Sequence, residues 1–186
     1  MRSFDRPTTP VTAPSAWVVR FAGLIPAGGP VLDLACGDGR HGRYLAERGH
    51  PVTLVDIDVQ GVADLAGQPG FEILQTDLET GRWPFGPGSF AGIVMTNYLH
   101  RPHFASMPGT LRPGGVLIIE TFAAGNELLG LLRNPDFLLA AGELLTVFHA
   151  TLQIVAYEHG REESPRPAIR QRLCAVRQAA PTADPR

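Results

Sequence analysis

Short apolar runs alternate with segments of helical spacing along the first two thirds of the chain. The runs are rich in Val, Ile and Leu, which is typical of strands buried inside a sheet. Strands that alternate with helices form parallel sheets with helices on both faces, so the pattern predicts a doubly wound α/β fold. The predicted strands are 31–34, 52–55, 71–74, 91–95 and 116–122. The predicted helices are 15–25, 40–48, 58–65 and 102–110.

The last third of the chain breaks this alternation. Residues 123–142 carry glycine, asparagine and proline between leucine pairs, so we expect loops and short helices there. A helix is predicted over 143–148, and two strands over 152–157 and 169–177 are joined by a charged loop alone. Strands joined without a crossover helix pair antiparallel. The expected fold is a Rossmann-like, mostly parallel seven-stranded sheet that ends in an antiparallel hairpin.

Both ends of the chain have the composition of irregular structure. Three prolines within residues 1–14 argue against a helix and predict a flexible arm. Ser15 can cap the helix that follows, which either packs on the sheet or acts as a lid over a bound cofactor. We expect residues 179–186 to be a disordered tail, which leaves a single domain over 15–178.

The composition of the chain excludes several classes of function. The formal net charge is -2, which offers no basic surface for nucleic acid. All 16 basic residues are arginines, so the chain can neither form a Schiff base nor supply the lysine of a phosphate-binding P-loop. Two cysteines are too few for a disulfide framework or a zinc site, and no signal peptide or membrane span is visible. We therefore expect a cytoplasmic protein without membrane contacts.

One stretch combines a strand, a glycine-rich turn and the start of a helix. Gly37, Gly39 and Gly42 follow the first predicted strand with the spacing G-x-G-x-x-G, and Asp56 ends the next strand. This pattern is typical of a nucleotide-cofactor site in which the acid holds a ribose diol. Cys36, inside the turn, is expected to pack behind it as a small residue.

Asp33 distinguishes this turn from that of a dinucleotide-binding site. Its carboxylate stands inside the strand, where an ionised group is costly unless it has a partner at the strand's carboxyl end. An acid there would repel a pyrophosphate, whereas it suits a cofactor with an ammonium or sulfonium group. A nicotinamide-dependent oxidoreductase that uses the same glycine spacing is the alternative.

The chain from residue 30 to 122 resembles the class I S-adenosylmethionine-dependent methyltransferases of small bacterial type. Five segments carry the resemblance in the family's order: D-x-A-x-G-x-G from Asp33, the strand ending at Asp56, Thr76-Asp77-Leu78, Asn97-Tyr98-Leu99, and L-x-P-G-G from Leu111. The resemblance implies S-adenosylmethionine as the cofactor and a single methyltransferase domain.

The resemblance also implies roles for individual residues. Asp56 would hold the ribose, Asp77 and Leu78 the adenine, and the glycine-rich turn the methionine end. Arg40 either pairs with the cofactor's carboxylate or is an exposed residue at a helix start. The implied cofactor-binding residues are Asp33, Ala35, Gly37, Gly39, Arg40, Asp56, Ile57, Asp77, Leu78 and Asn97.

The segment after the fourth strand supplies the catalytic candidates. Tyr98 and His100 stand next to the expected transfer site, where either could act as a base or contact the substrate. His100 and His103 make a poor metal pair, because Pro102 breaks helical spacing and no further Cys or His cluster supports it, so no metal is predicted. The segment also departs from the N-P-P-Y type of sequence of methyltransferases that act on nucleic-acid amino groups, which disfavours that substrate class.

The carboxyl-terminal half is similar to small bacterial methyltransferases of the tellurite-resistance type. The segments that carry this looser resemblance are 120–122, 125–127, 134–139 and 142–145. It implies a soft or oxyanionic small-molecule acceptor, such as a chalcogen compound or a thiol. Asn126, Arg133 and Asp136 are the implied substrate-side residues.

Methyl transfer from a sulfonium is an in-line displacement, for which a protein must hold the acceptor close, align it and exclude water. The sequence therefore predicts a methyltransferase that acts on a small molecule. A non-catalytic cofactor-binding module is a further alternative; it would act through a partner at the apolar stretch 128–132.

Overall fold

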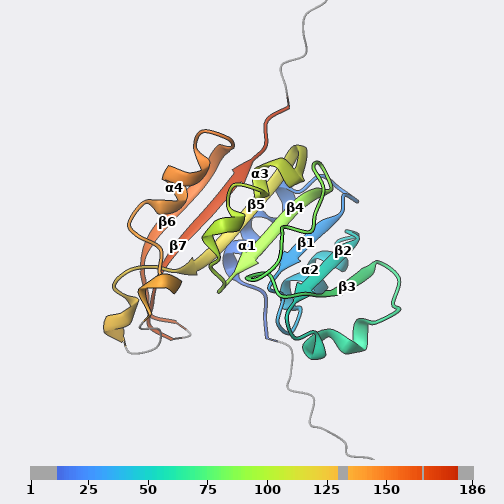
Figure 1. Ribbon diagram of the computed structural model, residues 1–186, viewed down its shortest axis with the longest axis horizontal. Coiled ribbons are helices and arrows are strands. Elements are labelled where there is room, and N and C mark those ends of the chain that lie inside the picture. The colour runs from blue at the N-terminus through green and yellow to red at the C-terminus, as the bar shows by residue number, and fades with distance from the viewer. Residues whose placement is uncertain (1–11, 130–133, 165, 180–186) are drawn as a thin grey trace, which may run out of the picture.

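The computed structural model describes residues 12–129, 134–164 and 166–179. They form one seven-stranded sheet with the strand order β3-β2-β1-β4-β5-β7-β6 (Figure 1). The strands are β1 (Val31–Leu34), β2 (Val52–Asp56), β3 (Phe71–Gln75), β4 (Phe90–Thr96), β5 (Leu111–Phe122), β6 (Gln153–Glu162) and β7 (Ala168–Val176). The α-helices are α1 (Ala16–Phe21), α2 (Arg40–Ala46), α3 (Met107–Thr110) and α4 (Glu143–Phe148). Short 3-10 helices lie at Ala22–Leu24, Gln60–Leu65, Arg101–His103, Asn126–Leu129 and Pro135–Phe137.

The strand pairing divides the sheet into a parallel part and an antiparallel end. β1 pairs in parallel with β2 and β4, and β3 and β5 extend this part on either side. β7 pairs antiparallel with both β5 and β6. The predicted Rossmann-like sheet with a carboxyl-terminal antiparallel hairpin is thereby confirmed.

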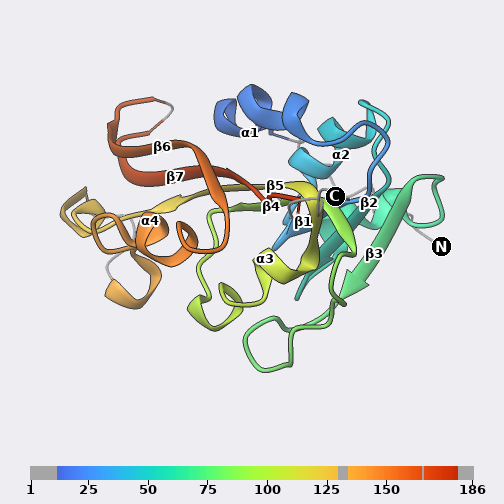
Figure 2. The ribbon, with the colours of Figure 1, turned by 90° about the horizontal axis from the view of Figure 1, so that it is seen from above.

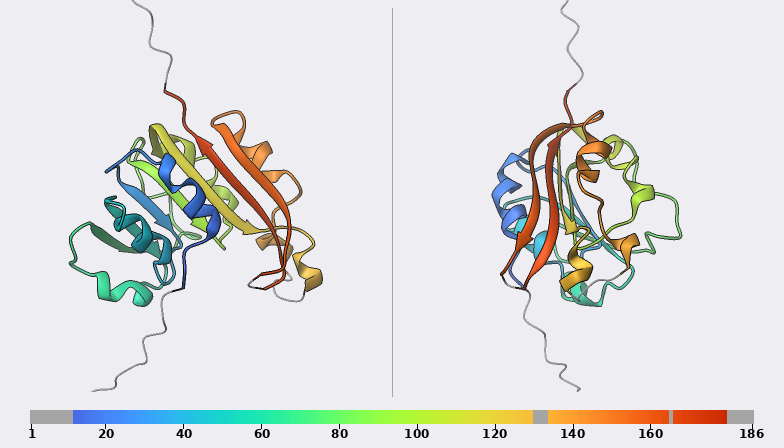
Figure 3. Two further views of the ribbon diagram at one scale, coloured as in Figure 1. Left: turned by 180° about the vertical axis from the view of Figure 1, so that it is seen from behind. Right: turned by 90° about the vertical axis from the view of Figure 1, so that its left-hand side faces the viewer.

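Helices cover both faces of the sheet. Figure 2 shows α1 and α2 on one face and α3 and α4 on the other, and Figure 3 shows α1 lying against β5. Because successive side chains of a strand point to opposite faces, Val31 joins the core under α1 and α2, whereas Leu32 joins the core under α3 and α4. Two apolar cores thus hold the strand ends that carry the site.

The chain enters the fold through a capped helix. The Ser15 hydroxyl accepts a hydrogen bond from the Trp17 amide at 3.1 Å, which is the predicted cap of α1. No helix in the described residues is long and apolar enough to cross a bilayer. Residues 1–11 of the predicted arm over 1–14, and residues 180–186 of the predicted tail over 179–186, lie outside the described residues.

The predicted helix over 102–110 is wrong in extent, because the structure divides it into a 3-10 helix and α3. Pro108 stands in the first turn of α3. A proline has no N–H, and its ring collides with the carbonyl four residues earlier, so a continuous helix cannot pass through it. The predicted helix over 58–65 is a 3-10 helix as well.

Two strands are longer than predicted. β6 continues to Glu162, so the first half of the predicted loop over 158–167 is strand and the prediction is wrong there. There Glu158 lies opposite Arg172 of β7, and such charged cross-strand pairs stabilise a strand without any apolar alternation. β5 begins at Leu111, which pairs with Phe90 before a register shift.

Candidate functional site

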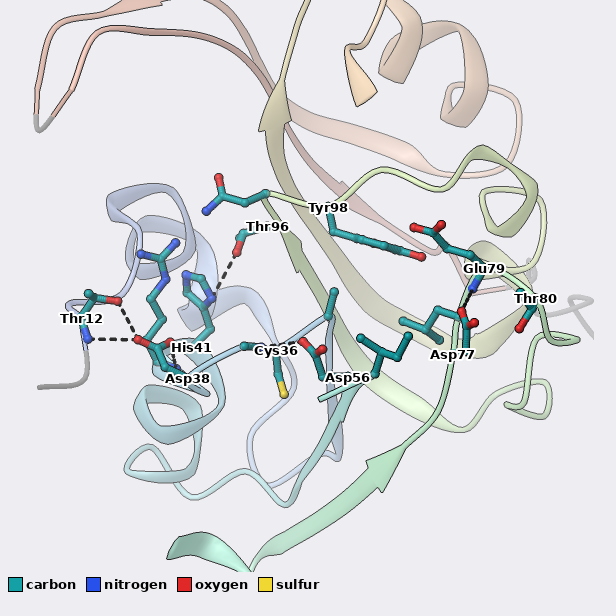
Figure 4. A pocket seen from close by; sticks show the side chains of 16 residues that line it. Thr12, Cys36, Asp38, His41, Asp56, Asp77, Glu79, Thr80, Thr96 and Tyr98 are labelled. Carbon is teal, nitrogen blue, oxygen red and sulfur yellow. Dashed lines mark hydrogen bonds between the residues drawn. The ribbon is translucent and has the colours of Figure 1, made fainter. Parts of the chain in front are cut away.

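A cavity of about 570 Å³ opens at the carboxyl ends of β1, β2 and β4 (Figure 4). In open α/β sheets ligands bind at this edge, because the loops after neighbouring strands leave a crevice there. The wall comes from the segment before α1, the turn after β1, the end of β2, the segment after β3 and the end of β4. Its residues are Thr12, Ala35, Cys36, Gly37, Asp38, Arg40, His41, Asp56, Ile57, Asp77, Leu78, Glu79, Thr80, Thr96, Asn97 and Tyr98.

The glycine-rich turn closes against the carboxylate of Asp56. Gly37 has φ 57° and Gly39 has φ 71°, left-handed conformations that favour glycine. The Gly37 amide donates to Asp56 Oδ2 at 2.9 Å, and the Asp58 amide donates to Oδ1 at 3.1 Å. Each carboxylate oxygen retains a lone pair, so Asp56 can also accept hydrogen bonds from the hydroxyls of a ligand.

Asp33 lies beneath the turn and not in the cavity wall. It is 1% exposed, and its Oδ2 accepts a hydrogen bond from the Gly42 amide at 2.8 Å. A Cβ at Gly42 would lie 2.3 Å from Leu54 Cδ2, so only glycine lets α2 approach the sheet this closely. Burial raises the pKa of Asp33 to about 7, although the Gly42 amide opposes the shift. In the structure the partner of Asp33 is therefore a backbone amide of α2 and not the ligand that its position in the strand suggested, and the Asp33 carboxyl group anchors that helix.

The segment after β3 forms one end of the cavity. Asp77 Oδ1 accepts a hydrogen bond from the Glu79 amide at 2.8 Å, which lowers the pKa of Asp77. Leu78 is buried beside it, and its carbonyl accepts a hydrogen bond from Nε2 of the buried His103. This bond holds the Leu78 backbone from outside the cavity, in a segment that has no regular structure of its own.

A buried histidine joins the opposite end of the cavity to the segment before α1. The Ser15 amide donates to His41 Nε2 at 3.2 Å, which leaves the proton of the neutral ring on Nδ1, 3.4 Å from Thr96 Oγ1. Burial lowers the pKa of His41 to about 4, so the ring is neutral at pH 7. Thr12 donates to Asp38 Oδ2 from its amide and its hydroxyl (Figure 4).

Tyr98 follows β4 and faces the cavity. Figure 4 shows its ring across the cavity, with the hydroxyl towards Asp77 and Glu79. The hydroxyl is buried and has no hydrogen-bond partner in the part of the chain that the structure describes. Burial and the nearby carboxylates hold the pKa of Tyr98 well above its usual range, so the phenol stays a donor. A buried donor without a partner at the edge of a cavity is a sign of a ligand that accepts from it.

The structure brings most of the predicted cofactor residues together. Those in the wall are Ala35, Gly37, Arg40, Asp56, Ile57, Asp77, Leu78 and Asn97. Asp33 and Gly39 shape the turn from outside the wall. Of the two catalytic candidates, Tyr98 lines the cavity, whereas His100 does not and packs with its ring 4.6 Å from that of His103.

The predicted substrate-side residues lie apart from this cavity. Asn126 is fully buried, and its Oδ1 accepts a hydrogen bond from the Ile169 amide at 3.0 Å. Asp136 lies in a 3-10 turn, where its amide donates to the Asn134 side chain at 3.0 Å. Both residues therefore hold loops in place, and Arg133 lies outside the described residues.

Several wall residues were not predicted. They are Thr12, Cys36, Asp38, His41, Glu79, Thr80 and Thr96. Cys36 lines the cavity as well as packing behind the turn, and burial raises the pKa of its thiol to about 12, so the thiol stays protonated. Asp38 and His41 could have been predicted as wall residues, because they lie within or next to the glycine motif in the sequence. Nothing in the sequence indicates that Thr12 lines the cavity. The described residues contain no group of three or more His, Cys, Asp or Glu side chains that could hold a metal.

Comparison with known proteins finds one matching domain model. Residues 31–115 match the model of a methyltransferase domain. The matched span runs from β1 into β5 and includes the glycine-rich turn, Asp56 and Asp77. No curated protein matches the chain at a significant level.

Many solved structures share the fold. A SAM-dependent methyltransferase from Methanosarcina mazei is 16% identical, with a TM-score of 0.68 over 91% of this chain and 100% of that one. TehB from Haemophilus influenzae is 21% identical, with a TM-score of 0.70 over 87% of this chain and 61% of that one. The 1,6-didemethyltoxoflavin-N1-methyltransferase of Burkholderia thailandensis, solved with 1,6-didemethyltoxoflavin and S-adenosylhomocysteine, is 20% identical, with a TM-score of 0.64 over 88% and 79% of the two chains.

The chain thus has the fold of the class I S-adenosylmethionine-dependent methyltransferases, and its residues 31–115 match the model of a methyltransferase domain. Together the two findings indicate S-adenosylmethionine as the cofactor.

Proposed function

We propose that this protein transfers a methyl group from S-adenosylmethionine to a small-molecule acceptor. Asp56 carries the proposal. Its carboxylate stands at the end of β2, is oriented by the Gly37 and Asp58 amides, and lines the cavity with lone pairs to spare. A ribose diol can donate to both of its oxygens, and hydrogen bonds to a carboxylate are stronger than those to a neutral acceptor.

The charge of the wall fits a cationic cofactor. Asp38, Asp56, Asp77 and Glu79 line the cavity, against the single guanidinium of Arg40. S-adenosylmethionine carries a sulfonium and an ammonium group against one carboxylate, so carboxylates in the wall favour its binding. The pyrophosphate of a nicotinamide dinucleotide would instead meet these acids, which disfavours the oxidoreductase alternative.

Each part of the cofactor has matching residues along the cavity. We assign the adenine to Asp77 and the Leu78 backbone, and the methionine part to the turn at Ala35 and Gly37. Arg40 is the cation available to the cofactor's carboxylate, since it is the only positively charged side chain among the described wall residues. Asp33 and Gly39 contribute indirectly, because they fix the path of the turn.

The chain's own contribution to catalysis is alignment and shielding. The sulfonium methyl group is an activated electrophile, so no dedicated nucleophile is required. Tyr98, with its raised pKa, is a poor base and a good donor to a bound ligand. His41 Nε2 already accepts from the Ser15 amide, so it is not free to take a proton. We therefore propose in-line displacement without a dedicated base, with Tyr98 as a ligand contact.

The class of acceptor and the compartment are also proposals. A small molecule is favoured because the chain's net charge of -2 gives nucleic acid no basic surface. Cys36 and Cys174 are both free and buried, which suits the reducing conditions of the cytoplasm.

Calorimetric titration with S-adenosylhomocysteine and with NAD tests the proposal. The wild type is expected to bind S-adenosylhomocysteine and not NAD. Replacing Asp56→Ala should weaken binding of S-adenosylhomocysteine roughly ten- to a hundredfold, since two charge-assisted hydrogen bonds are lost.

Asp64→Ala is the matched control. Asp64 pairs with Arg43 at the surface, outside the cavity wall, so its replacement should leave the affinity unchanged. A folded wild type that binds NAD, or that binds neither compound, would refute the proposed function.

A further inference from the structure

A second cavity, of about 560 Å³, adjoins the first. We call it the hairpin cavity, because its walls are residues 13–17 on one side and the β6–β7 hairpin on the other. Arg40 and Asn97 line both cavities, so the two meet at the end of β4. In the proposed function the methionine end of the cofactor lies in the first cavity, next to this border. A molecule in the hairpin cavity could then reach the methyl group that is transferred.

The glutamates of the hairpin cavity are all neutralised by arginines. The pairs are Arg20–Glu158 at 2.9 Å, Arg170–Glu162 at 2.5 Å and Arg172–Glu120 at 2.8 Å. The three glutamates therefore add no net negative charge to the cavity. Arg40 differs from the other arginines of this cavity, because its side chain makes no hydrogen bond or ion pair with any residue that the structure describes. At the border with the cofactor cavity there is therefore one guanidinium that is held in no ion pair among the described residues, although the charge of Asp38 acts on it.

The border also offers unused N–H donors. Arg170 donates from Nε to Glu162 and from Nη1 to Asn97 Oδ1 at 2.6 Å, which leaves its Nη2 hydrogens without a partner among the described residues. Because a guanidinium only donates, Asn97 Oδ1 is fixed as the acceptor, and the Asn97 NH2 group is left for another partner. Asn97 has φ 54°, a conformation that non-glycine residues rarely adopt and that is concentrated at functional sites.

We propose that the hairpin cavity is the acceptor site and that the acceptor is a small organic acid, whose carboxylate is held by Arg40, Arg170 Nη2 and the Asn97 amide. Donors in a fixed fork match the geometry of a carboxylate. Arg40 has five N–H groups, enough to serve the cofactor's carboxylate along one edge and the acceptor's along another. The inference rests on the proposed function, since an acceptor in the hairpin cavity can receive a methyl group only if the cofactor occupies the first cavity.

Three probes of one size and different charge test the inference. Benzoate, benzamide and benzylamine are titrated calorimetrically into protein saturated with S-adenosylhomocysteine. Benzoate is expected to bind about tenfold or more tightly than benzamide, with benzylamine weakest, because a charged acceptor strengthens each guanidinium hydrogen bond.

Two variants locate the effect. Arg40→Gln should remove the preference for benzoate, and the variant should fold normally because the Arg40 side chain makes no hydrogen bond or ion pair with the described residues. Arg161→Gln is the matched control, since Arg161 lies in the same hairpin, pairs with Glu163 and does not line the cavity. Each variant is saturated at ten times its own dissociation constant for S-adenosylhomocysteine.

The outcomes separate the two proposals. Tight benzoate binding that is lost in Arg40→Gln and kept in Arg161→Gln supports the acceptor site. If S-adenosylhomocysteine binds but benzoate binds no better than benzamide, or if Arg40→Gln keeps the preference, the inference is overturned and the proposed function stands. If the folded wild type does not bind S-adenosylhomocysteine, the proposed function fails and the inference fails with it.

Discussion

At the scale of single residues, burial decides which groups of the site carry charge. Asp33 and Tyr98 are acids whose pKa burial raises, and His41 is a base whose pKa burial lowers. All three shifts favour the uncharged form, since a low-dielectric interior penalises an ion. Asp77, whose pKa the Glu79 amide lowers, stands in the cavity wall, as does Asp56, and a cationic ligand can meet both side chains there.

The shift at Asp33 predicts a pH dependence of stability. The pKa is about 7 in the folded chain and about 3.9 in an unfolded one. Between these values the folded chain keeps a proton that the unfolded chain has lost, so the free energy of unfolding falls as pH rises. Asp33→Asn removes this titration. We expect the free energy of unfolding of Asp33→Asn, relative to wild type, to increase from pH 4 to pH 7 in urea titrations.

The comparison needs only the difference between the two proteins, because the other titrating groups are common to both. Asp64→Asn is the control, since Asp64 is exposed and its pKa is lowered by Arg43. A constant difference between Asp33→Asn and wild type across this range would show that Asp33 titrates normally.

Residue roles were predictable where they follow from the spacing of a backbone motif. Gly37, Asp56 and Asp77 belong to such a pattern, and all three line the cavity. The cost of burying Asp33 was also predictable, but its partner was not, because no sequence pattern shows that the Gly42 amide comes within 2.8 Å. The same holds for His41, whose contacts come from a segment 26 residues away in the chain.

At the scale of elements, the position of α2 decides the shape of the turn. α2 contacts both β1 and β2, and the close approach depends on the missing side chain of Gly42. A Cβ there would lie 2.3 Å from Leu54 Cδ2 and 3.2 Å from Asp33 Oδ2. Any side chain at Gly42 must therefore move the helix, the strand or the buried carboxyl group.

Gly42→Ala is expected to lower the free energy of unfolding by about 1–3 kcal/mol, the usual cost of overpacking a core. Gly109→Ala is the matched control in α3, where no atom lies within 4 Å of the new Cβ. Because alanine is the better helix former, that change should be neutral or stabilising by up to about 1 kcal/mol. Urea titrations measure both, and equal stability of the two variants would show that the contact at Gly42 relaxes freely.

Elements were predictable where apolar burial forms them. β1, β2 and β4 are buried on both faces, and their apolar runs mark them to within one residue at either end. The predicted end of β6 fell five residues too early, because the second half of this strand is held by charged pairs to β7 and looks like a loop in the sequence. The break between Arg101–His103 and α3 was missed, although Pro108 was its signal.

At the scale of the whole molecule, the strand order explains why two cavities share one border. β1 and β4 are neighbours in the sheet, while the chain continues from them towards opposite edges, to β2 and to β5. The loops after these two strands therefore diverge and leave a crevice at their carboxyl ends. The antiparallel β7 and β6 extend the sheet beyond β5 and add a second wall, which supplies the arginines and glutamates of the hairpin cavity.

A ligand seated in that crevice stabilises the whole fold. S-adenosylhomocysteine at a hundred times its dissociation constant should raise the free energy of unfolding by about 2.7 kcal/mol. For a chain of this size that shifts the melting temperature by roughly 5–11 °C. At the same concentration Asp56→Ala should keep only about 0.4–1.4 kcal/mol of this effect, because its affinity is ten- to a hundredfold lower. NAD should leave the melting temperature unchanged, so a rise with NAD but none with S-adenosylhomocysteine, recorded by scanning calorimetry, would assign the crevice to a dinucleotide.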